Sequence, residues 1–221
     1  MTGTWADLFG IDAATGLAPR KASAPLAELP GDWPFGGLQQ RAYGVILADP
    51  PWRYELYSAA GEDKSPQAHY QCMDADDIAA LPVHRLARRD AVLIMWATAP
   101  LLDVALNVMA AWGFAYKTMG AWHKQTATGK HTAFGTGYIY RSAMEPWLLG
   151  TVGTPELRAK DVRNLIVAPV REHSRKPDLM RHTIERQFHG PYAELFARER
   201  APGWDSWGNQ VDKFGGEDGR S

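Results

Sequence analysis

An unbroken apolar run followed at once by two prolines constrains this chain more than any other feature. Residues 43–48 read YGVILA, and residues 49–52 read DPPW. A short continuous apolar run is typical of a strand buried on both faces, as the strands of a parallel sheet are. The two prolines then end the strand, because neither has an N–H group to donate to a neighbour. The sequence therefore predicts a buried parallel strand that ends at Asp49.

Strand and helix patterns alternate along the rest of the chain. Apolar segments predict strands at 43–48, 91–98, 115–122, 144–149, 165–170, 192–197 and 204–207. Helices are predicted at 74–86, 100–112 and 177–188, and a long polar loop at 124–137. This order indicates an α/β, Rossmann-like fold with a mostly parallel twisted sheet and helices on both faces. Ligands of such sheets bind beyond the carboxyl ends of the strands, where Asp49 is expected.

Length and composition set the expected domain organisation. The 221 residues, of which 45% are hydrophobic, suit one domain with short appendages. Residues 1–30 are rich in Ala, Gly and Pro without a sustained period, and the last residues are Gly-rich and charged. We expect an irregular N-terminal arm at 1–30, the folded domain at 31–212 and a flexible tail at 213–221.

Cysteine and histidine usage argues against disulfides and metals. Cys72 is the single cysteine, and the seven histidines show no credible metal-ligand spacing, so we expect no metal site. The start of the chain lacks the pattern of a signal peptide, and no apolar run approaches the ~20 residues of a membrane span. We therefore expect a cytoplasmic protein that does not enter a membrane.

The charge balance limits how the chain could hold nucleic acid. The formal net charge is −1, whereas proteins that bind nucleic acid tightly on their own are usually basic. Any such contact should be local, brief or shared with a partner. Basic residues between 117 and 131 lie beside Trp122, which would suit a flipped nucleotide and its phosphates. A solvated charged surface is the alternative there.

The tetrapeptide 49–52 has the chemistry of a receptor for an aromatic amine. Its prolines leave the Asp49 carboxylate and the backbone carbonyls as a rigid cluster of acceptors, and Trp52 adds a flat ring. The exocyclic amine of adenine is one such amine. Acceptors on both of its hydrogens would favour a pyramidal nitrogen, whose lone pair could attack a methyl group held in line with it. These four residues alone also allow a simple proline-stiffened turn.

Several segments, in order and spacing, resemble the MT-A70 family of adenine-N6 methyltransferases from about Tyr43 to Gln210. The matching pieces are VILADPPW, His69-Tyr70, the LIMWAT strand, Trp122 with Lys124, Glu145, SRKPD at 174–178, ELF at 194–196 and WGNQ at 207–210. The resemblance implies a class I methyltransferase fold and S-adenosylmethionine (SAM) as the cofactor.

The resemblance also implies a role for each matching residue. Asp49 would accept from the adenine amine and contact the methionyl amino group of SAM, and the Pro50 carbonyl would accept from the amine. The implied catalytic residues are Asp49, Pro50, Pro51 and Trp52. The implied cofactor-binding residues are Asp32, Asp49, Lys176, Phe196, Arg198, Asn209 and Gln210. The implied substrate-binding residues are Trp52, Tyr70, Trp122, Lys124 and Glu145.

Local chemistry agrees with two of these roles and departs from the family at one position. Lys176 precedes Pro177, which suits the first turn of a helix, so its ammonium should lie where anions collect. An ordinary solvated lysine is the alternative. Asn209 and Gln210 offer amide groups, although a plain turn would account for them equally well. Ala197 stands where the family commonly has glycine, which places the geometry of that loop in question.

The resemblance implies an N6-adenine methyltransferase that acts on a flipped or unpaired adenine. We favour DNA because the chain is compact and lacks a eukaryotic-style extension, with RNA as the competing substrate. Two further hypotheses are a catalytically silent nucleic-acid-binding partner subunit and an enzyme that methylates cytosine N4 or a protein amide. The presence of Asp49 and Lys176 argues against a silent subunit, and Trp rather than Tyr at position 52 favours adenine. Association as a homodimer or heterodimer is compatible with the family.

Overall fold

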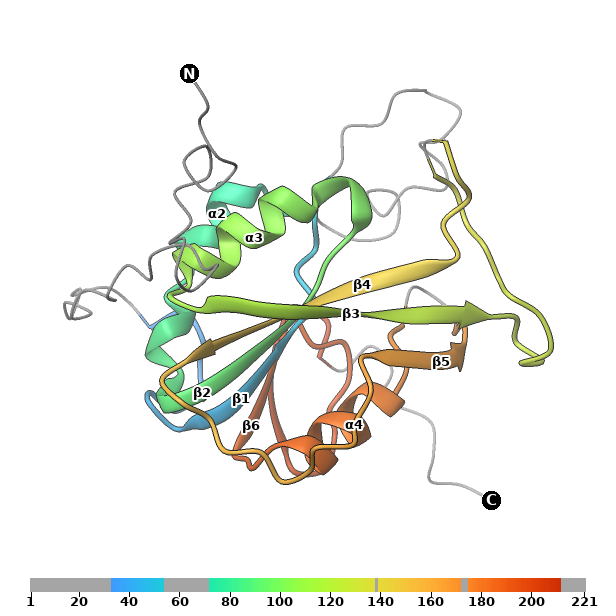
Figure 1. The fold of residues 1–221 in the computed structure, drawn as a ribbon. Helices are drawn as coiled ribbons and strands as arrows, with labels where there is room; N and C mark the ends of the chain where they lie inside the picture. Colours follow the sequence, from blue (N-terminus) through green and yellow to red (C-terminus); the bar gives the residue numbers. More distant parts are fainter. Residues whose placement is uncertain (1–32, 54–71, 138, 172–174, 212–221) are drawn as a thin grey trace, which may run out of the picture. The chain divides into compact units, whose positions relative to one another are not determined.

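A computed structural model describes residues 33–53, 72–137, 139–171 and 175–211. Their strands form one seven-stranded sheet in the order β5-β3-β4-β2-β1-β6-β7 (Figure 1). The strands are β1 (Tyr43–Ala48), β2 (Ala87–Trp96), β3 (Ala115–Gln125), β4 (Met144–Val152), β5 (Leu165–Pro169), β6 (Tyr192–Leu195) and β7 (Trp204–Trp207). The helices are α2 (Ala75–Ala80), α3 (Leu102–Ala111) and α4 (Leu179–Gln187), with 3-10 turns η3 (Val83–Arg85) and η4 (Ala99–Leu101).

The sheet is mostly parallel, as the alternating sequence pattern predicts. Strand β4 runs antiparallel to both of its neighbours, β2 and β3, and the other neighbouring pairs are parallel. Helices α2 and α3 lie on one face of the sheet and α4 lies on the other (Figure 1). The predicted α/β, Rossmann-like architecture with helices on both faces is therefore confirmed.

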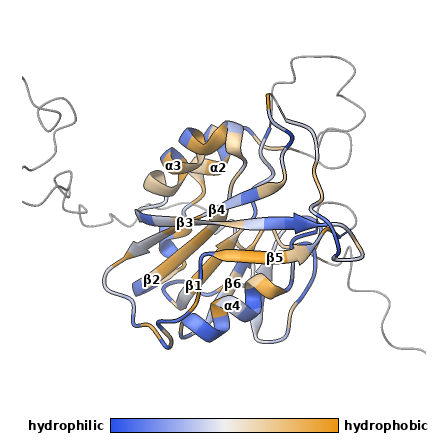
Figure 2. Cartoon of the chain, turned by 45° about the vertical axis from the view of Figure 1, so that its right-hand side comes forward, coloured by the Kyte–Doolittle hydropathy of each residue, from blue (hydrophilic) through white to orange (hydrophobic). Residues whose placement is uncertain are grey.

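Strand β1 is apolar throughout because it has a core on each side. Ile46 and Ala48 belong to the core that includes α2 and α3, whereas Val45 and Leu47 belong to the core that includes α4. Period-two alternation sends successive side chains of a strand to opposite faces. The hydrophobic colouring of the central strands in Figure 2 reflects these two cores.

Several element boundaries differ from the sequence prediction. The helix expected at 74–86 is the short α2 followed by the separate turn η3. Strand β2 begins at Ala87 rather than position 91, because Ala87 pairs with Tyr43 across an irregular register. Strand β3 continues to Gln125, so Lys124 lies in a strand and the long loop begins after it. Helix α4 begins at Leu179 rather than at Pro177.

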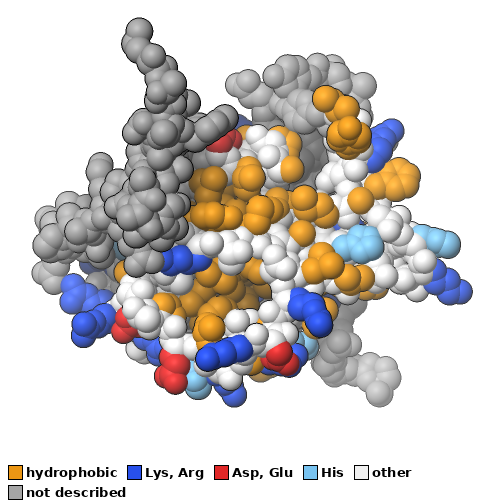
Figure 3. Space-filling model, in the orientation of Figure 1, with side chains coloured by type: hydrophobic (Ala, Val, Ile, Leu, Met, Phe, Trp, Pro, Cys, Tyr) orange, Lys and Arg blue, Asp and Glu red, His pale blue; other side chains and the backbone are white. Residues whose placement is uncertain are grey.

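Apolar side chains also reach the surface at the β5 end of the sheet. Ile166 and Ala168 of β5 are buried, whereas the alternate residues Leu165 and Val167 are 54% and 44% exposed. Figure 3 shows apolar side chains gathered on the viewed face of the molecule. In the part of the chain that the structure describes, no helix has the length and apolar character needed to cross a membrane.

The sheet topology brings one end of each of the seven strands to one edge. Six strands run in the same direction, so their carboxyl ends share that edge: β1, β2, β3, β5, β6 and β7. Because β4 is antiparallel, its amino end reaches the same edge and carries Glu145 there. Asp49 follows β1 and Phe196 follows β6 at adjacent positions. The edge predicted to bind ligands is therefore where these residues meet.

Candidate active site

The turn at 49–52 is a cluster of hydrogen-bond acceptors. Its two backbone N–H groups are already used: Asp49 donates to the Leu195 carbonyl at 3.3 Å, and Trp52 donates to the Pro50 carbonyl at 2.9 Å. The Pro51 carbonyl accepts from the Met73 N–H at 2.9 Å. A carbonyl oxygen has two lone pairs, so Pro50 can accept one further hydrogen bond. The turn therefore offers a ligand the Asp49 carboxylate and backbone oxygens.

A chain of four alternating charges runs away from Asp49. Lys176 Nζ lies 3.0 Å from each carboxylate oxygen of Asp49 and 2.9 Å from Glu145 Oε1. Lys124 Nζ lies 2.9 Å from Glu145 Oε2. The four side chains are between 17% and 24% exposed. Lys176 Nζ also lies 5.4 Å from the ring centroid of the buried Trp96, within cation–π range.

These contacts fix the charge states of the chain. Burial alone would raise the pKa of Glu145, but the ammonium groups of Lys176 and Lys124 outweigh it and lower that pKa to about 2. Burial alone would lower the pKa of Lys176, but Asp49 and Glu145 raise it well above its ordinary value. Glu145 is therefore an anion, and Lys176 a cation, across the physiological pH range.

A cavity of about 530 Å³ opens beside the turn. This volume is in the range of sites that take drug-sized ligands. Five residues that the family resemblance assigns to the cofactor line it: Asp49, Phe196, Arg198, Asn209 and Gln210. Lys176 reaches the same place through its contact with Asp49. The structure thus brings together residues from the ends of β1, β6 and β7.

The cavity also has lining residues that the sequence did not single out. They are Arg53, Cys72, Met73, Asp74 and Asp77, whereas the lining residues Pro51, Ala197, Trp207 and Gly208 belong to segments that the sequence analysis named. Residues 72–74 reach the site because Met73 forms a bridge with Trp52. No motif marks these residues, and only this non-local pairing places them. Within the described ranges, no group of three His, Cys, Asp or Glu side chains is arranged to hold a metal ion.

The turn after β6 accommodates alanine where the family commonly has glycine. The residue with a left-handed backbone is Phe196, at φ +60°, and Ala197 has an ordinary φ. Gly208 packs against this turn so closely that a Cβ there would lie 2.6 Å from the Ala197 carbonyl oxygen. Trp207 packs edge-on against Phe196 at 5.3 Å between ring centroids. The close packing that requires glycine is therefore at position 208.

Two aromatic residues predicted to contact the substrate are buried in the cores. Trp52 is 5% exposed and its indole N–H donates to the Trp96 carbonyl at 3.1 Å. Trp122 is 3% exposed and its indole N–H donates to the Ala168 carbonyl at 2.9 Å. The sheet register turns the Trp122 ring toward α4, and its contact with a substrate stays a prediction.

The remaining predicted substrate residues divide into two groups. Lys124 and Glu145 belong to the charge chain, where Glu145 joins Lys124 to Lys176. Their contact with a substrate stays a prediction. Tyr70, and the predicted cofactor residue Asp32, lie outside the described residues.

The chain is similar to methyltransferases along most of its length. It is 29% identical over 210 residues to the type II methyltransferase M.MunI of Mycoplasma sp, covering 87% of this chain and 88% of that protein. It is 29% identical over 215 residues to the human N(6)-adenine-specific methyltransferase METTL4, covering 90% of this chain and 43% of that protein. It is 32% identical over 176 residues to an MT-A70-like N(6)-adenosine-methyltransferase of Arabidopsis thaliana, covering 77% of this chain and 24% of that protein. The chain spans most of the first relative and less than half of the second and third.

The sequence pattern of the MT-A70 family matches residues 43–210. The match begins at β1 and includes the turn at 49–52, the charge chain and the cavity residues Asn209 and Gln210. The resemblance drawn from these motifs is confirmed: the chain belongs to the MT-A70 family of N6-adenine methyltransferases.

Proposed function

We propose that this protein is a SAM-dependent N6-adenine methyltransferase that acts on DNA, on an adenine that is flipped or unpaired. One observation carries the proposal. Asp49 lies at the end of β1, lines the cavity and contacts Lys176. The same carboxylate can therefore serve a ligand in the cavity and an amine brought to the turn.

The charge pattern fits the methionyl end of SAM. An α-amino acid is a zwitterion, with one ammonium and one carboxylate. Lys176 and Asp49 form an ion pair at 3.0 Å, and a zwitterion that enters between them gives each a new partner of opposite charge. Glu145, at 2.9 Å from Lys176, keeps the lysine at the site while Asp49 changes partner.

Other residues that line the cavity fit the nucleoside part of SAM. Asn209 and Gln210 supply amide groups that can donate and accept, and Arg198 supplies a guanidinium. Phe196 and Trp207 supply aromatic surface in the same cavity. These residue types suit a ribose and a flat base. When bound, SAM supplies the electrophilic methyl group.

The turn at 49–52 fits the second substrate, an exocyclic amine. The Asp49 carboxylate and the Pro50 carbonyl can each accept one amine hydrogen, which leaves the nitrogen lone pair directed at the methyl group. As the N–C bond formed, the bond from the methyl carbon to the sulfonium sulfur would break and leave a neutral thioether. The nitrogen would lose a proton, and the Asp49 carboxylate would be the acceptor in contact with it. A paired adenine cannot present its amine to a recessed carboxylate, so flipping or a single strand is required.

DNA is the favoured polymer because of the extent of the similarity. The chain matches 88% of the type II methyltransferase of Mycoplasma sp, whereas it matches 24% of the plant N(6)-adenosine-methyltransferase. RNA is the competing substrate.

A matched comparison of polymers tests the proposal. The purified protein is incubated with methyl-labelled SAM and four oligonucleotides of one sequence: single-stranded and duplex DNA, and single-stranded and duplex RNA. The Asp49→Ala variant is the control. We expect incorporation into DNA that the variant lacks. Incorporation into RNA alone would assign the competing polymer, and incorporation that survives in the variant would overturn the proposed role of Asp49.

A further inference from the structure

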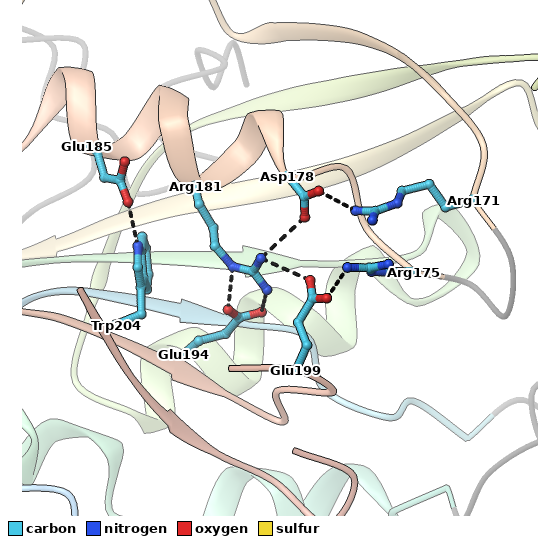
Figure 4. Close-up of polar contacts among 8 residues, drawn as sticks. All are labelled: Arg171, Arg175, Asp178, Arg181, Glu185, Glu194, Glu199 and Trp204. Atoms are coloured by element: carbon cyan, nitrogen blue, oxygen red, sulfur yellow. Dashed lines mark hydrogen bonds and ion pairs between the residues drawn. The ribbon is translucent and has the colours of Figure 1, made fainter. Parts of the chain in front are cut away.

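A second ion cluster lies beside the candidate active site, outside the cavity. It contains three guanidinium groups and three carboxylates in mutual contact: Arg171, Arg175, Arg181, Asp178, Glu194 and Glu199 (Figure 4). The charges balance. The members come from three separate segments: the stretch before α4 with its first turn, strand β6, and the turn after β6.

Arg181 is the hub of this cluster. Its Nε donates to Glu194 Oε2 at 2.8 Å, and its Nη2 donates to Glu194 Oε1 at 3.3 Å. Its Nη1 donates to Glu199 Oε1 at 3.0 Å and to Asp178 Oδ1 at 3.3 Å. The Arg181 side chain is 14% exposed, and it points from α4 toward all three carboxylates (Figure 4). Only a planar group with several donors can serve three acceptors in this way.

Two of the three partners of Arg181, Glu194 and Glu199, are adjacent in sequence to residues that contact or line the site. Glu194 precedes Leu195, whose carbonyl accepts the Asp49 N–H. Glu199 follows Arg198, which lines the cavity. Glu199 also accepts from Arg175, which precedes Lys176. The single guanidinium of Arg181 therefore connects the backbone segments that carry Lys176, Asp49 and the turn 196–198.

Glu199 is buried, so loss of one of its ion pairs should affect the structure around it. Glu199 is 8% exposed, so its charge needs partners, and Arg175 and Arg181 supply them. If Arg181 is lost, the segment before α4 and the turn after β6 lose their common partner. The Arg175–Glu199 pair alone would then join these two segments, and both halves of the proposed SAM site could shift. Small displacements of binding groups weaken a site without any loss of contacting residues.

We propose that Arg181 is a positioning residue for the methyl donor: it sets the distance between Lys176 and the turn 196–198 without touching the ligand. This inference rests on the proposed function. Arg181 is not among the described residues that line the cavity. No pattern in the sequence marks it, since its partners lie up to 18 residues away on separate segments.

The experiment compares Arg181→Met and Arg181→Lys with a control on the same helix. Arg186 also forms an ion pair, with Asp161, but both side chains are at least 60% exposed, so Arg186→Met is the control. Binding of S-adenosylhomocysteine is measured by calorimetry well below each variant's melting temperature, which is recorded in parallel. We expect about tenfold weaker binding for Arg181→Met, an intermediate loss for Arg181→Lys, and a change below about twofold for Arg186→Met.

A second variant separates positioning from folding. Glu199→Gln keeps the shape of the side chain and removes the charge that Arg175 and Arg181 share. It should weaken binding in the same direction, and the double variant with Arg181→Lys should lose less than the sum of the two. If melting temperatures fall while affinity stays within about twofold of the unchanged protein, Arg181 is only structural and the inference is overturned. If the unchanged protein binds no S-adenosylhomocysteine, the proposed function fails and the inference fails with it.

Discussion

Lys176 holds the carboxylate of Asp49 from 127 positions away in the sequence, with 3.0 Å between Nζ and each oxygen. The pair joins the end of β1 to the segment that enters α4. Both side chains are largely buried, and Lys176 also forms an ion pair with Glu145. Under the proposed function, a zwitterionic ligand would exchange partners with this pair.

Removal of the Lys176 charge should affect stability and binding together. In Lys176→Met, Asp49 and Glu145 lose their shared cation while remaining largely buried, which should lower the free energy of unfolding by about 3 kcal/mol. Calorimetry should show S-adenosylhomocysteine binding weakened by more than about tenfold. The control is Lys117→Met on the exposed part of β3. Tight binding by folded Lys176→Met would contradict the proposed role of the lysine.

Acid should remove the contribution of Glu145. Its pKa in the folded protein is about 2, below the ordinary value of 4.5, so its stabilising effect is full above pH 4.5 and is lost as the pH falls toward 2. Urea unfolding should show Glu145→Gln less stable than the unchanged protein by about 2 to 3 kcal/mol at pH 7. The difference should shrink steadily below pH 4.5. Glu156→Gln, at an exposed position, should show no such trend.

Trp52 should behave as a core residue. Trp52→Phe removes the indole N–H that donates to the Trp96 carbonyl and leaves a smaller ring in the core. The free energy of unfolding should fall by about 2 kcal/mol. The KM for an oligonucleotide should change by less than about threefold. A large rise in KM with unchanged stability would instead show that the ring contacts the base, as the family resemblance implies.

Gly208 should tolerate no side chain. In Gly208→Ala the new Cβ would meet the Ala197 carbonyl oxygen at 2.6 Å and the Ala197 nitrogen at 2.8 Å. The turn would have to move, and with it Phe196 and Arg198 of the cavity. S-adenosylhomocysteine binding should weaken by about tenfold. Gly37→Ala, where no heavy atom lies within 4 Å of the new Cβ, is the matched control and should bind normally.

The fold followed from the sequence where local pattern decides it. The run 43–48 is apolar because both faces of β1 are buried, and the alternation of elements specified the sheet. The antiparallel β4 was not foreseen, since an apolar strand pattern carries no direction. The extension of β3 to Gln125 was missed because its last residues, such as Lys124, are polar and resemble the start of a loop.

The site was predictable where a motif lies in one segment. Asp49 and the prolines act through their own turn, so four residues indicate their chemistry. The cofactor role expected for Lys176 came from the family resemblance, and its contact with Asp49 was out of reach of periodicity. The burial of Trp122 was not predicted, because the register of β3 with β4 and β5 decides which face its ring occupies. Arg181 forms ion pairs with Glu194 on β6 and Glu199 in the following turn. No local sequence pattern predicts these contacts between separate segments.

The identity of the methylated nucleoside decides whether the turn at 49–52 methylates adenine. DNA methylated by the purified protein is digested to nucleosides and analysed by mass spectrometry, with Asp49→Asn, which keeps the shape of the side chain, in parallel. We expect N6-methyldeoxyadenosine from the unchanged protein and at least about a hundredfold less from the variant. Methylated cytosine, or an equal yield from Asp49→Asn, would contradict the proposed function.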